Sequence, residues 1–245
     1  MKKNIHLSNL FIYFLCCLSL LLSFYLNEDG SYLPFSMDFK DTWPYVLKLK
    51  ENFLTDPYPH TVHYPLHYYL LSRLDLVFND PLIVRLVICF ISMALPYIFF
   101  VALKEKYKEK NINILFIVFL SIFFIPAFRY SSVWANDRIT TDIFILLGCY
   151  FFFKYEFLRI KNVKYLYISF LLFALACYSR QFYAVYYALF IIYIFRNDSL
   201  KNFINLSIYS VTLSLPGFYL LYKFPYFLEG IGYSGNIFNT LLGNV

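Results

Sequence analysis

Long apolar runs separated by short charged connections constrain the fold of this chain more than any other feature. The first run, Leu7 to Leu26, contains no charged residue, and a helix needs about 20 such residues to cross about 30 Å of hydrocarbon. The chain is 60% hydrophobic and only 15% charged, far more apolar than an ordinary soluble domain. In lipid, a helix satisfies all of its own backbone hydrogen bonds. We therefore predict an all-helical integral membrane protein.

The apolar runs predict a polytopic bundle of about seven spans that forms one module over residues 1–245. The expected spans are residues 7–26, 82–103, 112–128, 143–157, 203–222 and two within 165–195, divided at Ser179-Arg180-Gln181. Residues 27–80 then form a long outer loop. In that loop, Thr42 followed by Pro44 predicts one helix start, and Pro65 predicts a second. Apolar residues at helical spacing, such as Leu70 and Val77, predict that both amphipathic helices lie in the interface plane.

The charged connections predict the orientation, because Lys and Arg near the spans concentrate on the cytoplasmic side. Basic residues gather in segments 104–110, 159–164 and 196–201, whereas most acidic residues fall in the alternate connections. We therefore expect a cytoplasmic amino terminus and an outward-facing loop 27–80. The 21 basic residues exceed the 15 acidic ones but form no continuous stripe, so nucleic acid is not an expected partner.

Two carboxylates near the start of the outer loop are candidate catalytic residues. A carboxylate at a membrane surface can accept the proton of an attacking hydroxyl as a general base, and Asp38 and Asp41 are placed for this role. Asp41 has an alternative explanation, because an acid just before the expected cap Thr42 also favours a helix amino terminus. For Asp38 the alternative is an exposed loop residue.

Three histidines, His60, His63 and His67, lie in the same loop. They could suggest a metal site, but Pro59 and Pro65 interrupt any helix that would align them, and no motif fixes a fourth ligand. We therefore expect no metal, and we interpret His63 and His67 as candidates for contacts with a sugar or a phosphate. Solvated rings at the interface are the alternative.

Arginines at membrane depth are costly and are therefore functional candidates. Arg85 and Arg180 both fall at the ends of apolar runs, where snorkelling to the headgroups is the alternative explanation. Arg180 is placed to hold a phosphate with two parallel hydrogen bonds. Arg129, Asp137 and Arg138, in the second outer loop, could complete that pocket or form an ordinary surface ion pair.

Several short motifs follow one another in a recognisable order. They are Met37-Asp38 with Pro44, Asp56-Pro57, Pro65-Leu66-His67-Tyr68 and Arg180-Gln181. With one span before a long outward loop, this order resembles the membrane-embedded glycosyltransferases of the GT-C superfamily, and locally the dolichyl-phosphate-glucose alpha-1,2-glucosyltransferase family. Phe39 and Leu66 depart from that family, which has an acid and a glycine there. Pro81 to Lys104 is similar to a span of bacterial polyprenyl-phosphate-sugar transferases, which favours a bacterial plasma membrane over the endoplasmic reticulum.

The resemblance implies transfer of a sugar, with inversion, from a polyprenyl-phosphate donor to a lipid-linked or cell-envelope glycan acceptor on the non-cytoplasmic side. The residues it implies are Asp38 as base, Arg180 with Arg129 or Arg138 for the departing lipid phosphate, and His63, His67 and Gln181 for contacts with sugar or phosphate. The scheme requires no metal or other cofactor, and its partners are the donor, the acceptor and membrane lipid. Members of this class are usually longer, so we also expect a fragment or a minimal form.

Three other interpretations remain open on the sequence. Intramembrane arginines also suit a transporter or flippase for a lipid-linked sugar, in which Asp38 would not matter. An envelope polysaccharide polymerase also joins sugars, but it uses Arg-rich outer loops in place of a single base. A truncated chain could instead be a structural assembly partner.

Overall fold

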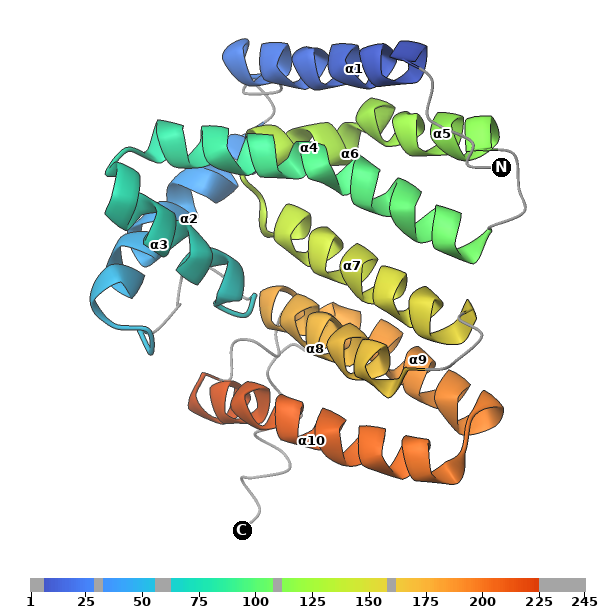
Figure 1. Ribbon diagram of the computed structural model, residues 1–245. Coiled ribbons are helices and arrows are strands. Elements are labelled where there is room, and N and C mark those ends of the chain that lie inside the picture. The colour runs from blue at the N-terminus through green and yellow to red at the C-terminus, as the bar shows by residue number, and fades with distance from the viewer. Residues whose placement is uncertain (1–6, 29–32, 56–62, 108–111, 158–161, 225–245) are drawn as a thin grey trace.

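The computed structural model describes residues 7–28, 33–55, 63–107, 112–157 and 162–224, and over these ranges the chain forms helices and no strand (Figure 1). The elements are α1 (Leu7–Tyr25), α2 (Leu33–Glu51), α3 (Leu66–Phe78), α4 (Pro81–Lys106), α5 (Ile112–Leu120), the 3-10 turn η1 (Ser121–Phe124), α6 (Pro126–Val133), α7 (Asp137–Phe157), α8 (Val163–Ser179), the 3-10 turn η2 (Gln181–Tyr183), α9 (Ala184–Asn197) and α10 (Leu200–Lys223). The all-helical prediction is confirmed for these residues.

Most of the helices run roughly side by side, and α2 and α3 pack together at one end of them (Figure 1). Helix α7 lies in the middle, packed against α4 on one side and α8 on the other, while α1 and α10 form the two edges. The α6–α7 turn and the α8–α9 break lie at the same end as α2 and α3. This end therefore gathers the connections that the sequence assigns to the outer side.

Every predicted span coincides with helical structure, but not every helix is long and apolar enough to cross a membrane. Helices α4 and α10 meet that requirement, and the pair Ile112–Phe124 and Pro126–Val133, bent by 60°, adds a third if it forms one broken span. The shorter apolar helices are Asn9–Tyr25 and Val163–Ser179. The structure thus has two or three candidate spans, and the larger number stays a prediction. The expected break within 165–195 is confirmed, since α8 ends at Ser179 and α9 begins at Ala184.

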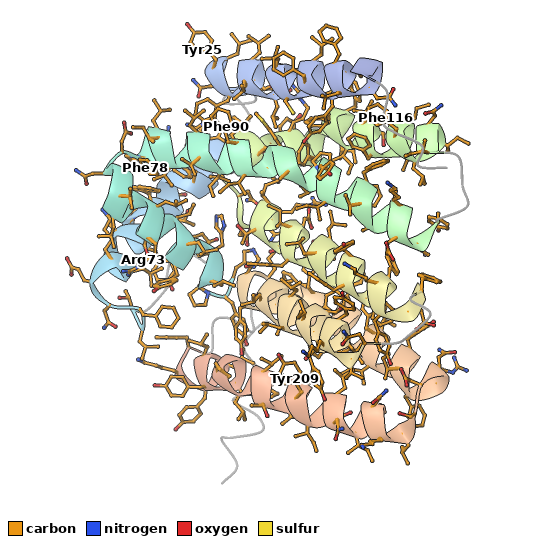
Figure 2. The ribbon with its side chains drawn as sticks, viewed as in Figure 1. Tyr25, Arg73, Phe78, Phe90, Phe116 and Tyr209 are labelled. Atoms are coloured by element: carbon orange, nitrogen blue, oxygen red, sulfur yellow. The ribbon has the colours of Figure 1, made fainter. Side chains whose placement is uncertain are left out.

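Large apolar side chains cover the outer surface of the bundle. Tyr25 at the end of α1 is 81% exposed and points away from the other helices (Figure 2), and Phe78 and Phe90 are also exposed. A protein in water rarely presents contiguous apolar surface on this scale. Such a surface is compatible with a lipid environment.

Helix α2 starts earlier than the sequence predicts. It begins at Leu33, so Thr42 lies in its middle and donates from Oγ1 to the Phe39 carbonyl at 3.3 Å instead of capping the amino terminus, and Pro44 lies inside the helix. An internal proline costs about 3 kcal/mol. Tertiary packing outweighs that cost, because the following turns bury Tyr45, Val46 and Leu49 almost completely.

Helix α3 starts after Pro65, as predicted, but its buried face differs from the expected apolar face. The buried residues are His67, Tyr68, Leu71, Ser72 and Asp75, whereas Leu70 and Val77 are exposed. Polar partners on the bundle explain the difference. Asp75 forms an ion pair with Lys50 of α2, and His67 hydrogen-bonds with the α6–α7 region. The outward apolar side chains leave α3 suited to the membrane interface.

Candidate functional site

An ion pair between α7 and the α8–α9 break forms the centre of the candidate site. Asp137 is the first residue of α7, and Arg180 follows α8 with an extended backbone. The Arg180 Nη2 donates to Asp137 Oδ1 at 2.9 Å, and Asp137 is 2% exposed. Burial alone would lower the pKa of Arg180, but the charge and hydrogen bond of Asp137 hold that pKa above its usual value. Arg180 is therefore charged at neutral pH.

Each member of this pair retains an unused hydrogen-bonding atom. Among the described residues, the Oδ2 atom of Asp137 accepts no hydrogen bond and the Nε atom of Arg180 donates none, although both atoms are buried. Buried polar atoms are nearly always paired. An acceptor and a donor left open side by side are the arrangement expected where a polar ligand binds.

His63 lies next to the open oxygen of Asp137. Its Nε2 is 3.8 Å from Asp137 Oδ2, too far for a hydrogen bond. Burial lowers the pKa of His63 below its usual value, more than Asp137 and the hydrogen bond with Gln181 raise it. The ring is therefore neutral at pH 7, and the contact is polar but is not an ion pair.

His67 is fixed from both sides of its ring. It is 1% exposed, its Nε2 lies 2.8 Å from the Ala135 carbonyl oxygen, and its Nδ1 lies 2.8 Å from Thr140 Oγ1. A carbonyl can only accept, so Nε2 carries the proton and Nδ1 accepts from the threonine hydroxyl. Burial lowers the pKa of His67 to about 4, although Asp137 acts in the opposite direction. His67 thus joins α3 to the start of α7 as a neutral ring.

A small cavity separates α2 and α3 from the α6–α7 turn. Its lining residues are Phe39, Thr42, Tyr68, Leu71, Trp134, Ala135, Asn136 and Asp137. Position 38 lies one helical turn before Thr42 and therefore on the same face of α2, but the side chain of Asp38 lies outside the described residues. Asp41 is exposed, and it lies well inside α2, so a position at the helix amino terminus no longer explains it.

An apolar groove of about 230 Å³ opens between α8, α9 and α10. Ala174, Cys177, Leu213 and Phe218 are among its lining residues, together with Tyr64 and Gln181. Gln181 directly follows Arg180 and also contacts His63. The groove and the Asp137–Arg180 pair are therefore neighbours.

The other two predicted arginines form ion pairs with other carboxylates. Arg129 donates to both carboxylate oxygens of Glu28 and to the hydroxyls of Ser19 and Ser23, which ties α6 to α1. Arg138 lies 3.6 Å from Asp142 and borders a separate hollow between α4, α6 and α7. Among the described residues, Arg180 is the one of the three whose side chain forms an ion pair with Asp137.

Sequence reasoning missed several polar residues around the site. Tyr183 of η2 donates to Asp142 Oδ1 at 3.0 Å, and Trp134 lines the cavity. Thr140 and Thr141 were missed as well, and spacing could have indicated them. They follow Asp137 by three and four residues, as on one helix face, and all three residues are buried.

Arg85 does not snorkel. It is 8% exposed, it donates from Nε to the Val133 carbonyl at 3.1 Å, and it stacks on Trp134.

Among the described residues no three His, Cys, Asp or Glu side chains are grouped to hold a metal ion, and His60 lies outside those residues.

Comparison with known proteins adds no relative. No protein-family model, no curated protein and no solved structure matches this chain.

Proposed function

We propose that this chain is an integral membrane glycosyltransferase that moves a sugar from a polyprenyl-phosphate donor to a lipid-linked or cell-envelope glycan acceptor. The reaction takes place on the non-cytoplasmic side of a bacterial plasma membrane. One observation carries the proposal: the Asp137–Arg180 pair adjoins an apolar groove through Gln181. A lipid-borne phosphate needs an apolar path for its chain and a guanidinium donor for its head, and this part of the chain offers both.

The reaction follows from these groups. The acceptor hydroxyl oxygen attacks the anomeric carbon from the side opposite the phosphate, a new carbon–oxygen bond forms, and the bond from that carbon to the phosphate oxygen breaks. Asp38 takes the hydroxyl proton as general base. Arg180 donates from its open Nε to the departing phosphate, a stabilisation that is large in a site with little water.

Some of the remaining polar groups are assigned contacts with the ligand, and the others bind partners within the protein. Contacts with sugar hydroxyls are assigned to the open oxygen of Asp137 and to its neighbours His63 and Gln181. His67 is assigned no ligand contact, because both of its ring nitrogens are engaged within the protein. Arg129 is likewise assigned no ligand contact, because it forms an ion pair with Glu28.

The base is assigned to Asp38 and not to Asp41 because Asp41 is exposed, whereas position 38 precedes the buried Thr42 by one helical turn. Position 38 shares a face with Thr42, which lines the cavity, whereas Asp41 is exposed. This difference supplies a matched pair of variants, Asp38→Asn and Asp41→Asn, that remove the same charge one turn apart.

The test uses the purified chain in lipid nanodiscs, radiolabelled polyprenyl-phosphate sugars and a membrane lipid extract as acceptor. Asp38→Asn should lower the transfer rate about 10²-fold to 10⁴-fold, while Asp41→Asn should stay close to wild type. Failure of the wild type to transfer from any donor would remove the enzyme proposal. Equal transfer by wild type and Asp38→Asn would remove the assigned base.

A transporter for a lipid-linked sugar is the second candidate, because it would use the same groove and the same guanidinium. It predicts movement of the donor across a liposome membrane without a new glycosidic bond. Asp38→Asn would then leave that movement unchanged.

A further inference from the structure

The turn that leads from α6 into α7, residues 133–137, has a backbone conformation that its sequence does not favour. Ala135 has a φ of 48°, in the left-handed region where glycine is the usual residue. The turn closes as a Schellman motif, in which the Asn136 N–H donates to the Ser131 carbonyl at 2.9 Å. An alanine keeps this conformation only where surrounding contacts enforce it.

Two side chains from other helices hold the carbonyls of this turn. Arg85, on α4, donates from Nε to the Val133 carbonyl at 3.1 Å, and its guanidinium carbon lies 3.8 Å from the centre of the Trp134 ring. His67, on α3, donates from Nε2 to the Ala135 carbonyl at 2.8 Å. The strained residue and the residues before it are thus tied to two separate helices.

Charge pairing does not explain Arg85. Among the described residues, its Nη2 has no hydrogen-bond partner and no carboxylate forms an ion pair with it. A guanidinium at the end of an apolar helix is costly to bury. Its guanidinium also lies over the rings of Phe24 and Phe39, at 5.2 and 5.6 Å, but over the described part of the chain its one hydrogen bond and its shortest ring contact are with the turn.

We infer that Arg85 and His67 are positioning residues, which hold residues 133–137 so that Asp137 presents its open Oδ2 to the cavity. This rests on the proposed function, in which Asp137 contacts the substrate. Arg180 fixes the Oδ1 atom of Asp137 at 2.9 Å, so the backbone of the turn decides where Oδ2 lies.

The first test compares two arginines that make the same kinds of contact. Arg85→Lys keeps the charge but removes the Nε donor and the planar stack. Arg73 is the matched control, because it donates to the Leu49 carbonyl at 2.9 Å and stacks on Tyr69 at 4.6 Å, away from the turn. A misplaced reacting group costs up to about 10²-fold in rate. Arg85→Lys should therefore lower kcat about tenfold to 10²-fold with little change in KM, and Arg73→Lys should change neither.

Two double variants show whether Arg85 acts through the turn. In the Asp137→Asn background, Arg85→Lys should have no further effect, because residues that act as a unit are not additive. Ala135→Gly removes the penalty of the left-handed conformation, so it should restore most of the turnover lost in Arg85→Lys. If Arg85 instead bound an anionic group of the ligand directly, glycine would not restore turnover, and the inference would be overturned.

A measurement that needs no activity separates this inference from the proposed function. Amide hydrogen exchange in peptides covering residues 131–140 should be severalfold faster in Arg85→Lys than in Arg73→Lys. Equal exchange in the two variants overturns the inference whatever the substrate. If exchange is faster in Arg85→Lys but the wild-type chain transfers no sugar, Arg85 holds the turn as inferred and the proposed function is wrong.

Discussion

Acid should destabilise this protein through one buried side chain, His67. The folded protein keeps this ring neutral, and burial lowers its pKa to about 4 from the usual 6.5. Between pH 6.5 and 4 the unfolded chain therefore binds a proton that the folded chain does not, so stability falls as the pH falls through this window and is unaffected above it. Each unit of pKa difference corresponds to about 1.4 kcal/mol, so the loss at pH 4 is about 3 kcal/mol.

The assay compares thermal unfolding of wild type and His67→Gln in detergent, at pH 7 and at pH 4. Glutamine can donate to the Ala135 carbonyl but does not titrate. Carboxylates distant from His67 titrate in both proteins and cancel in the comparison. For a chain of this length the wild-type midpoint should fall roughly 6 to 12 °C further than that of the variant.

Two controls make this prediction specific. His63→Gln should keep the larger part of the acid loss, because His67 is still present in that variant, and should lose only the part that the buried ring of His63 contributes. A direct titration of the histidine rings by nuclear magnetic resonance should find His67 neutral down to about pH 4. A ring that titrates near 6.5, or equal acid losses in wild type and His67→Gln, would refute the account of a buried neutral imidazole.

Three further predictions concern how the helices are held together. Lys50→Met leaves the carboxylate of Asp75, which is 2% exposed, without its ion pair, and should lower the unfolding free energy by about 3 to 5 kcal/mol in chemical denaturation. Gly148→Ala places a Cβ against the ring of Phe173, closer than van der Waals contact allows, and should cost about 1 to 3 kcal/mol through overpacking of α7 on α8, measured by the thermal midpoint. Tyr178→Phe removes a hydroxyl that bridges a carbonyl and an N–H of α10 and should cost about 1 kcal/mol, with faster amide exchange in that helix.

Each of these three has a matched comparison. Adding Asp75→Leu to Lys50→Met should recover most of the loss, because no buried charge then remains unpaired; no recovery would mean that Lys50 acts through packing. Gly217→Ala should be milder than Gly148→Ala, because its Cβ would meet its nearest neighbour at 3.4 Å. Unchanged exchange in Tyr178→Phe would show that α10 does not depend on the bridge.

The sequence predicted the helices well because apolar runs report directly which segments leave water. It also predicted the break at Arg180, since an arginine and a glutamine inside a long apolar run interrupt it. The start of α4 also has a local cause. Asp80 accepts from the Leu82 N–H at 2.8 Å and Pro81 occupies the first helical position, the local pattern that the Asp-Pro pair indicates. All of these features depend on neighbouring residues only.

The features that the sequence could not predict depend on contacts between distant segments. The early start of α2 follows from burial of Tyr45 and Leu49 against other helices, which overrides the local preference set by Pro44. The buried face of α3 is polar because its side chains bind partners on other helices: Asp75 pairs with Lys50 of α2, and His67 hydrogen-bonds with Thr140 of α7. Periodicity shows where an apolar face lies but does not show which polar side chains have a partner.

The candidate site illustrates the same limit at the level of single charges. The sequence singled out Arg180 as the phosphate ligand, and it left open whether Arg129 and Arg138 complete the same pocket or form surface ion pairs. The structure separates them by their partners: Arg129 is paired with Glu28, and Arg138 lies beside Asp142. Among the described residues, Arg180 is the one of these three arginines that keeps a buried donor without a partner. Because an unpaired buried donor is costly, its persistence beside the equally unpaired oxygen of Asp137 is the strongest physical reason to expect a ligand there. A ligand that bridges these two atoms must present an acceptor to one and a donor to the other, which a phosphate carrying a sugar does.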